Sequence, residues 1–411
     1  MKTRIAFLLV VAHVALAQDH WVATWTTAQA LVRNPVPPAI ANAAPKGPLP
    51  PGARGFTNQT VRMMVRTSIP GKRLRVKLTN SFGANPVTVG AAHIALRKAN
   101  SEIVEGSSRA LAFDGKPATV IGPGAVILSD PVDLNIPATG DLAVSLFFPG
   151  ETGPPTNHAT GLHNTYIKEG NVTAAASLVE AETTQSYYYL AGIDVLAPAN
   201  AALIVAYGDS ITDGARSTNE TNHSWPALLA ARLQAKKETA HLGVANMGIG
   251  GNRVLRDGTG ASALARLDRD VFSQSGVKYL MMLEGINDIG RGATVPAETV
   301  TTAELIAAYK QIIERAHTQG IVVIGCTITP YEGAGYQRPE GEAVRKEFNN
   351  WVRTSKAFDY VVDFEAAIRD PKNPGKMKAE FDPGDHLHPN DAGYQAMADA
   401  IDLGIFTKKR K

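Results

Sequence analysis

Three residues of the sequence have the types and the spacing that acyl transfer through a serine nucleophile requires. Ser210 follows the apolar run 203–207, so we expect it at the carboxyl end of a strand. At that position the hydroxyl is accessible and the backbone N–H can face a developing oxyanion. Asp385 precedes His388 by three residues in one loop, a spacing that can set the carboxylate on imidazole Nδ1 and leave Nε2 for a serine.

Each of these segments also has a simpler interpretation. The sequence Gly208-Asp209-Ser210 is compatible with an ordinary turn in which the aspartate or the serine caps a helix. His386 offers the neighbouring aspartates a second imidazole partner. His386, His388 and two aspartates are also the types of residue that bind metals, but they supply at most two nitrogen ligands and no distant ligand motif supports them. We therefore predict no metal site.

Two further segments with polar donors follow expected strands. A glycine-rich turn at 246–252 comes after the strand-like residues 240–245 and leaves several backbone N–H groups unobstructed. A phosphate-binding loop is the competing interpretation, but Arg253 stands where the dinucleotide motif needs its last glycine. Asn287 follows the apolar residues 281–283 and supplies a side-chain amide donor at the same expected sheet edge.

Taken in order, the four segments resemble the signature blocks of the SGNH hydrolases, also called GDSL esterases, over about residues 200–405. The resemblance implies a flavodoxin-like α/β fold and hydrolysis of a carboxylic ester without a cofactor. It implies Ser210 as nucleophile, His388 as base and Asp385 as the carboxylate that orients the base. It also implies three oxyanion donors: the backbone N–H groups of Ser210 and Gly251 and the side-chain amide of Asn287.

The pattern of apolar residues changes near residue 197 and predicts two domains. Residues 18–197 contain short runs bounded by Gly and Pro, which predict an antiparallel β-sandwich or jelly-roll-like accessory domain. Residues 198–411 alternate apolar runs with amphipathic stretches, which predict a parallel sheet covered by helices. The expected strands are 74–79, 125–128, 142–148, 187–195, 203–207, 279–283, 321–328 and 360–362. The expected helices are 225–236, 303–317, 340–355 and 391–401.

The first 17 residues have the pattern of a secretory signal peptide. Lys2 and Arg4 precede the apolar run 5–14, and Ala-Leu-Ala at 15–17 fits a cleavage site before Gln18. The run is shorter than the roughly 20 residues that span a bilayer, and no later run reaches that length. We therefore expect a secreted, extracellular protein without a membrane span. Four sequons are candidate N-glycosylation sites: Asn58, Asn171, Asn219 and Asn222.

The composition excludes several classes of protein. Six of the 41 basic residues lie at the chain ends, at 2, 4 and 408–411, which leaves 35 basic against 38 acidic residues. That balance gives no broad basic face for nucleic acid. Charged residues make up 19% and hydrophobic residues 44% of the chain, which excludes wholesale disorder. The single cysteine, Cys326, excludes an intramolecular disulfide and a cysteine-built metal site.

The sequence narrows the substrate only to an ester. Residues 21–25 and 58–62 resemble the N-terminal domain of secreted two-domain SGNH hydrolases. Secretion and an accessory β domain favour removal of acetyl or other short acyl groups from a polysaccharide such as xylan or a pectic chain. A lipase-like or small-ester carboxylesterase is the alternative, although no long amphipathic lid is evident. A non-catalytic carbohydrate-binding protein is the alternative of another class, and the four intact segments disfavour it. The sequence does not fix an oligomeric state.

Overall fold

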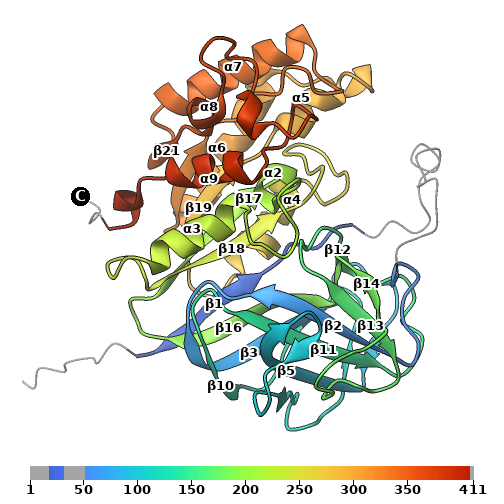
Figure 1. Cartoon of the computed structure of the whole chain (residues 1–411). Coiled ribbons are helices and arrows are strands. Elements are labelled where there is room, and N and C mark those ends of the chain that lie inside the picture. Colours follow the sequence, from blue (N-terminus) through green and yellow to red (C-terminus); the bar gives the residue numbers. More distant parts are fainter. Residues whose placement is uncertain (1–17, 32–50, 408–411) are drawn as a thin grey trace, which may run out of the picture.

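The computed structural model describes residues 18–31 and 51–407, which form two regions that follow one another along the chain (Figure 1). The first region is built from antiparallel strands, and the second contains one parallel sheet with helices around it. The expected signal peptide, residues 1–17, and the basic end of the chain, residues 408–411, lie outside the described residues.

Two large antiparallel sheets make up the first region. One has the order β1 (His20–Thr26), β16 (Leu190–Ala197), β3 (Gly71–Thr79) and β10 (Val132–Ile136), and β9 (Val126–Leu128) also pairs with β3. The other has the order β14 (Glu182–Thr184), β13 (Thr165–Glu169), β2 (Gln59–Arg66), β11 (Asp141–Phe148), β5 (Ala91–Ala99) and β6 (Glu102–Ile103), and β7 (Arg109–Ala110) pairs with β5. Two short pairs join β4 (Val87–Val89) to β8 (Thr119–Ile121) and β12 (Asn157–His158) to β15 (Tyr187–Tyr188).

Side chains from both large sheets share one core, so the region is a β-sandwich. In β3 the alternation of the sequence places Leu74, Val76 and Leu78 in that core and turns Arg75 and Lys77 to the other face. The predicted strand at 74–79 is therefore confirmed. The apolar run at 187–195 was predicted as one strand, and this is wrong. It is divided because Tyr189 has φ 56°, a left-handed backbone that interrupts the extended chain.

The sheet of the second region is parallel throughout. Its order is β18 (Leu242–Gly248), β17 (Ala202–Gly208), β19 (Val277–Leu283), β20 (Val322–Cys326) and β21 (Tyr360–Val362). Counted along the chain this is 2-1-3-4-5, the flavodoxin-like order. Every residue of β17 and β20 is buried, as expected for a sheet covered on both faces. Ligands of such sheets bind beyond the carboxyl ends of the first and third strands, here β17 and β19.

Helices pack around this sheet in two groups, α3 with α9 and α6 with α4 and α7 (Figure 1). The α-helices are α2 (Ser210–Asp213), α3 (Trp225–Gln234), α4 (Ala263–Leu267), α5 (Ile286–Arg291), α6 (Thr302–Thr318), α7 (Pro339–Thr354), α8 (Phe364–Ile368) and α9 (Asp391–Asp399). One π-helix, η1 (Asp268–Phe272), and the 3-10 turns η2 (Pro296–Glu298), η3 (Ala379–Phe381) and η4 (Leu403–Phe406) complete them. The four predicted helices correspond to α3, α6, α7 and α9. Among the described residues no helix has the length and apolarity to cross a membrane.

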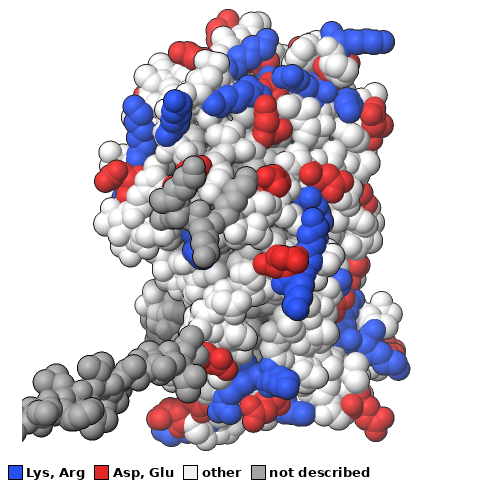
Figure 2. Space-filling model, turned by 90° about the vertical axis from the view of Figure 1, so that its left-hand side faces the viewer, with Lys and Arg blue, Asp and Glu red and all other residues white. Residues whose placement is uncertain are grey.

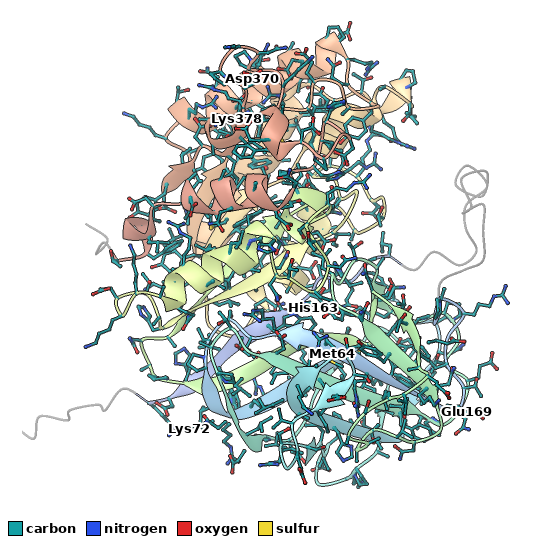
Figure 3. The ribbon with its side chains drawn as sticks, viewed as in Figure 1. Met64, Lys72, His163, Glu169, Asp370 and Lys378 are labelled. Atoms are coloured by element: carbon teal, nitrogen blue, oxygen red, sulfur yellow. The ribbon has the colours of Figure 1, made fainter. Side chains whose placement is uncertain are left out.

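The two regions are joined by hydrogen bonds as well as by packing. The N–H of Ala23 in β1 donates to the carbonyl of Ser275 at 3.0 Å, and the N–H of Val244 in β18 donates to Ser68 Oγ at 3.0 Å. Side chains fill the space between the two sets of ribbons, and His163 lies at their junction (Figure 3). On the face in Figure 2, Lys and Arg side chains are interspersed with Asp and Glu. Positive and negative side chains are therefore mixed on that face, and neither sign of charge dominates it.

Candidate active site

Ser210 is the first residue of α2, a single helical turn that begins just after β17. Asp209 caps the turn, because its side chain accepts a hydrogen bond of 2.9 Å from the N–H of Ile211. Gly208 is required by the tight approach of α2, since a Cβ there would lie 2.2 Å from Thr212 Oγ1. At the start of the helix the N–H of Ser210 has no intrahelical acceptor, so it can serve a ligand.

The imidazole of His388 lies against the Ser210 hydroxyl. Ser210 Oγ is 2.8 Å from His388 Nε2, and His388 Nδ1 is 2.9 Å from Asp385 Oδ2. Because a carboxylate only accepts, Nδ1 carries the imidazole proton and Nε2 accepts from the serine hydroxyl. The fold thus brings a serine and a histidine that are 178 positions apart into one hydrogen-bonded chain.

Asp385 is held by four hydrogen-bond donors. Its Oδ1 accepts from the N–H groups of Leu387 and His388 at 3.1 and 3.0 Å, and its Oδ2 accepts from His388 Nδ1 and Arg216 Nε, both at 2.9 Å. Burial alone would raise the pKa of Asp385, but the hydrogen bonds from His388 and Leu387 hold this pKa well below its ordinary value. No local sequence pattern predicts the role of Arg216, because its partner Asp385 is 169 positions away along the chain.

His386, the second histidine of this loop, has a different partner. Its Nδ1 lies 2.5 Å from Asp382 Oδ2, and its side chain is about half exposed, at 49%. His386 has φ 58°, so the backbone turns between the two histidines. The loop therefore contains two separate aspartate–histidine pairs, of which only Asp385–His388 contacts Ser210.

The expected oxyanion donors follow three adjacent strands. Ser210 follows β17, Gly251 follows β18 and Asn287 lies at the start of α5 after β19, and β17 is the middle strand of the three. Gly251 has φ +73°, which few other residues adopt. One amide hydrogen of Asn287 Nδ2 donates to the carbonyl of Asn252 at 2.9 Å, and the other remains for a ligand. The Asp288 carboxylate fastens the same loop by accepting from two backbone N–H groups, those of Val254 and Leu255.

A buried arginine behind these donors ties the strand ends together. Arg266 donates to the carbonyls of Gly208 in β17 and Met247 in β18 at 2.9 and 2.7 Å, and to Asn252 Oδ1 at 2.7 Å. Its guanidinium also lies 3.5 Å from the carboxylate of Glu284, which follows β19. One side chain thus spans the ends of the three strands that support Ser210, Gly251 and Asn287. No hydrophobic pattern or motif around Arg266 predicted this role.

The comparison with protein families agrees with this arrangement. Residues 206–396 match the GDSL-like lipase/acylhydrolase family, and the matched range contains all the residues described above. The chain carries a GDSL-like acylhydrolase domain. It is therefore a carboxylic ester hydrolase, as its four sequence blocks predicted. No curated protein matches the chain.

Solved structures similar to the acylhydrolase domain cover about half of the chain. LAE5, an alpha/beta hydrolase enzyme from the metagenome of Lake Arreo, Spain, is 26% identical, with a TM-score of 0.39, and the match covers 50% of this chain and 97% of that chain. Axe2, an acetylxylan esterase from Geobacillus stearothermophilus, is 24% identical, with a TM-score of 0.39, and the match covers 48% of this chain and 91% of that chain. The acetyl xylan esterase AlAXEase is 20% identical, with a TM-score of 0.38, and the match covers 48% of this chain and 96% of that chain.

Two buried acids lie beneath the site of the acylhydrolase domain. Burial, together with the neighbouring Asp288 and against the hydrogen bond from Ile211, raises the pKa of Asp209 to about 7. Burial and the charge of Asp209 also raise the pKa of Glu284 well above its ordinary value, although Arg266 opposes this shift. Both shifts favour the uncharged form of these two acids.

The remaining expectations concern metals and sugars. Within residues 18–31 and 51–407, no group of three His, Cys, Asp or Glu side chains is arranged to hold a metal ion. The sequons Asn58, Asn171 and Asn219 are exposed. Asn222 is half-buried, and its Oδ1 accepts a hydrogen bond of 2.9 Å from His163 Nε2. Its amide is therefore less accessible to glycosylation than those of the other three.

Proposed function

We propose that the chain is a secreted serine esterase that acts through Ser210, His388 and Asp385. The observation that carries this proposal is the hydrogen-bonded chain from Ser210 Oγ through the imidazole to Asp385, at 2.8 and 2.9 Å. Such a chain lets the imidazole accept the hydroxyl proton as the oxygen attacks a carbonyl carbon.

The proposed reaction has two halves. Ser210 Oγ forms a bond to the ester carbonyl carbon while its proton passes to His388 Nε2. The tetrahedral intermediate collapses as the bond to the alcohol oxygen breaks and that oxygen takes the proton from Nε2, which leaves an acyl-serine. Water then attacks the acyl-serine with His388 again as base, and the acid is released. Asp385 keeps its negative charge throughout and stabilises the imidazolium.

The negative oxygen of each intermediate needs donors that are already in place. The N–H groups of Ser210 and Gly251 and the free amide hydrogen of Asn287 are the donors that we assign to it. Supporting this assignment, each follows one of three neighbouring strands, and Asn287 is fixed to the Gly251 loop through the carbonyl of Asn252. A fixed donor does not have to reorient when charge develops on the oxygen.

For the substrate we propose a short acyl ester on a polysaccharide, with acetyl as the acyl group. The signal-like N-terminus supports an extracellular location, where a large carbohydrate is accessible. The triad is also accessible: the side chains of His388 and Asp385 are 18% and 24% exposed, so a bulky alcohol can lie outside while its acyl group reaches Ser210. A lipase-like or small-ester carboxylesterase is the alternative that the substrate test separates.

The proposed nucleophile is tested by Ser210→Ala, with p-nitrophenyl acetate as substrate. The variant should fold and be exported like the wild type but lose turnover, since removal of a catalytic serine typically lowers kcat by about 10⁴–10⁶-fold. Ser217→Ala is a matched control, because Ser217 Oγ donates to the carbonyl of Gly214 and does not contact the triad. An active Ser210→Ala protein would exclude the mechanism.

The substrate proposal is tested by comparing acetylated xylan with p-nitrophenyl esters of increasing chain length. Acetate release from the polysaccharide, together with falling kcat/KM as the acyl chain lengthens, supports it. Higher kcat/KM for long-chain esters and no acetate from the polysaccharide would favour the lipase-like alternative.

A further inference from the structure

The turn that carries Ser210 is too short to hold its own shape. α2 has four residues, and a helix of one turn fixes several dihedral angles for very few hydrogen bonds. Its start is anchored within its own region by Asp209, whose side chain accepts from the N–H of Ile211. Its last residue, Asp213, has one anchor in each region: its carbonyl accepts from Asn246 Nδ2 in β18 at 3.2 Å, and its carboxylate contacts His158 of the β-sandwich. The position of the serine hydroxyl thus depends on both ends.

His158 is surrounded by acceptors only. Its Nδ1 lies 2.9 Å from the carbonyl of Ala28, and its Nε2 lies 3.0 Å from Asp213 Oδ1 and 3.2 Å from the carbonyl of Thr160. Both ring nitrogens must therefore carry a proton. In either neutral tautomer one nitrogen lone pair would face an oxygen, so the contacts select the imidazolium cation.

The charge of this imidazolium is balanced by Asp213. The side chains of His158 and Asp213 are only 5% and 6% exposed, and a buried carboxylate without a cation is strongly destabilising. The ring of Tyr187 stacks beside the imidazole at 6.2 Å. Among the described residues, Asp213 is the one ionisable side chain in hydrogen-bond contact with His158. Burial lowers the pKa of His158, but Asp213 and the two carbonyls outweigh it, so the pKa is raised above its ordinary value.

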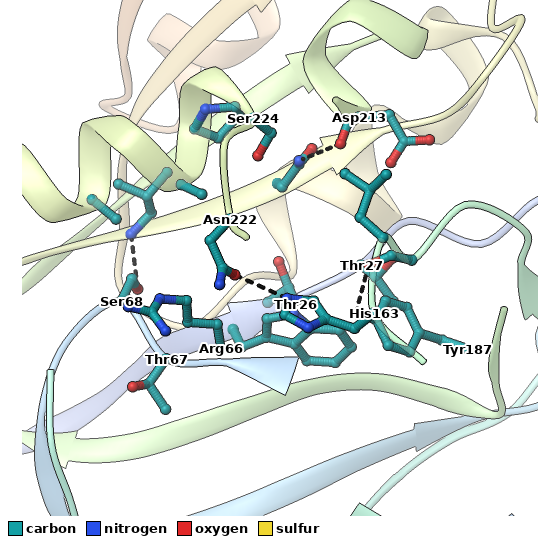
Figure 4. Close-up of a pocket in the computed structure, with 18 of the residues that line it drawn as sticks. Thr26, Thr27, Arg66, Thr67, Ser68, His163, Tyr187, Asp213, Asn222 and Ser224 are labelled. Atoms are coloured by element: carbon teal, nitrogen blue, oxygen red, sulfur yellow. Dashed lines mark hydrogen bonds between the residues drawn. The ribbon is translucent and has the colours of Figure 1, made fainter. Parts of the chain in front are cut away.

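The loop that follows α2 contacts the same part of the β-sandwich. His163 Nε2 donates to Asn222 Oδ1 at 2.9 Å (Figure 4). The N–H of Glu220 donates to the carbonyl of Leu162 at 2.8 Å. A cavity of about 110 Å³ lies between these contacts, with Asp213 and His163 in its lining. The loop also carries Arg216, which donates to Asp385. The β-sandwich therefore contacts the 220–222 part of this loop, whereas Arg216 is the loop residue that reaches the triad.

We propose that His158, in its charged form, is a positioning residue of the esterase. Through His158 the β-sandwich contributes to the geometry of the active site. The imidazolium fixes Asp213 and thereby holds α2 so that the Ser210 hydroxyl faces His388. This proposal rests on the serine mechanism proposed above and adds a residue outside the acylhydrolase match.

The proposal makes turnover depend on pH in a defined direction. A histidine whose folded pKa is raised stabilises the fold below the pKa of the unfolded chain, and this contribution is lost as pH rises through the folded pKa. Above that pH the imidazole is neutral, the contact with Asp213 weakens and the serine turn loosens. The kcat of the wild type should therefore fall on the alkaline side, with KM unchanged.

The test measures kcat and KM for p-nitrophenyl acetate across pH in His158→Gln, Asp213→Asn and the double variant. Each variant should lower kcat by about 10- to 100-fold at neutral pH, as expected for a small displacement of a nucleophile, with little change in KM. Each should lose the alkaline fall, because neither retains the ion pair. The double variant should be no worse than the single ones, since both remove one interaction.

His163→Gln is the matched control, because it removes another interdomain histidine that does not contact α2. It should keep both the kcat and the alkaline fall of the wild type. If His158→Gln and Asp213→Asn keep the kcat and pH profile of the wild type while Ser210→Ala is inactive, the role of His158 is overturned and the serine mechanism stands. Activity in Ser210→Ala would instead overturn the serine mechanism. If His158→Gln does not fold, Asp213→Asn decides, because it keeps an acceptor and removes only the charge.

Discussion

Arg62 and Arg266, two of the fully buried arginines, lie in different regions and show two uses of a buried cation. Arg62 in β2 donates to Ser145 Oγ and to the carbonyls of Ser101, Thr173 and Ala175, and no carboxylate of the described residues pairs with it. Burial lowers its pKa to about 10, so it remains charged at neutral pH. Arg62 therefore fastens peripheral loops onto an antiparallel sheet.

Arg266 is equally buried but lies where parallel strands end. It contacts the ends of β17, β18 and β19 and two carboxylates, Asp270 and Glu284, at 3.2 and 3.5 Å. In a parallel sheet covered on both faces, polar groups collect at the carboxyl edge, which is also where the substrate binds. We therefore expect Arg62, in the β-sandwich, to affect stability alone. We expect Arg266, at the carboxyl edge of the parallel sheet, to affect both stability and catalysis.

The largest expected effect separates the two histidines of the C-terminal loop. His388→Gln removes the base beside Ser210 and should lower kcat by about 10⁴-fold or more. His386→Gln is its matched control, because that imidazole pairs with Asp382 and is 49% exposed. Steady-state kinetics with p-nitrophenyl acetate measure both. Equal losses in the two variants would contradict the assignment of Asp385–His388 as the working pair.

The next effect concerns the oxyanion donors. Asn287→Ala removes a fixed amide and should lower kcat by about 10²–10³-fold, with a smaller change in KM, because the donor acts on charge that exists only in the transition state. The kcat and KM of purified enzyme at neutral pH are the readout. A change confined to KM would mean that the amide binds the ground-state substrate instead.

The comparison between the arginines is tested directly by Arg266→Met and Arg62→Met. Arg266→Met leaves buried acids and strand-end carbonyls without their donor, so it should lower kcat by about tenfold or more and the free energy of unfolding by about 3–5 kcal/mol. Arg62→Met should lower the free energy of unfolding and leave the kcat of the folded enzyme unchanged. Urea unfolding and kinetics on the folded fraction distinguish them. A lowered kcat in Arg62→Met would break the contrast between the regions.

The smallest effect is a pH-dependent change in stability. Because the pKa of folded Asp209 is raised to about 7, the folded state binds more protons there than the unfolded chain between pH about 4 and 7, and wild-type stability falls as pH rises. Asp209→Asn keeps an N-cap acceptor and does not titrate. As pH rises from about 4 to 7, the free energy of unfolding of Asp209→Asn should therefore increase relative to that of the wild type. Above pH about 7 the difference between the two proteins should stay constant. Urea unfolding at stepped pH measures the gap, and a constant gap would argue against a neutral buried Asp209.

The sequence predicted the features that depend on neighbours along the chain. Ser210 and Asn287 stand directly after apolar strands, so their places at the sheet edge followed from local pattern, as did α6, α7 and the alternation of β3. Contacts between distant segments left no local signal. Arg216 reaches Asp385 across 169 positions, and His158 reaches Asp213 across 55. Tyr189 breaks an apolar run through its backbone angle, which composition does not reveal.

The most direct test of the serine mechanism is labelling of the whole enzyme with a fluorophosphonate, followed by peptide mass spectrometry. We expect one adduct, on the peptide that contains Ser210. It should form in step with loss of esterase activity, and much more slowly in His388→Gln, where the base is absent. An adduct on a different residue with activity lost, or full inactivation with Ser210 unmodified, would contradict the serine mechanism.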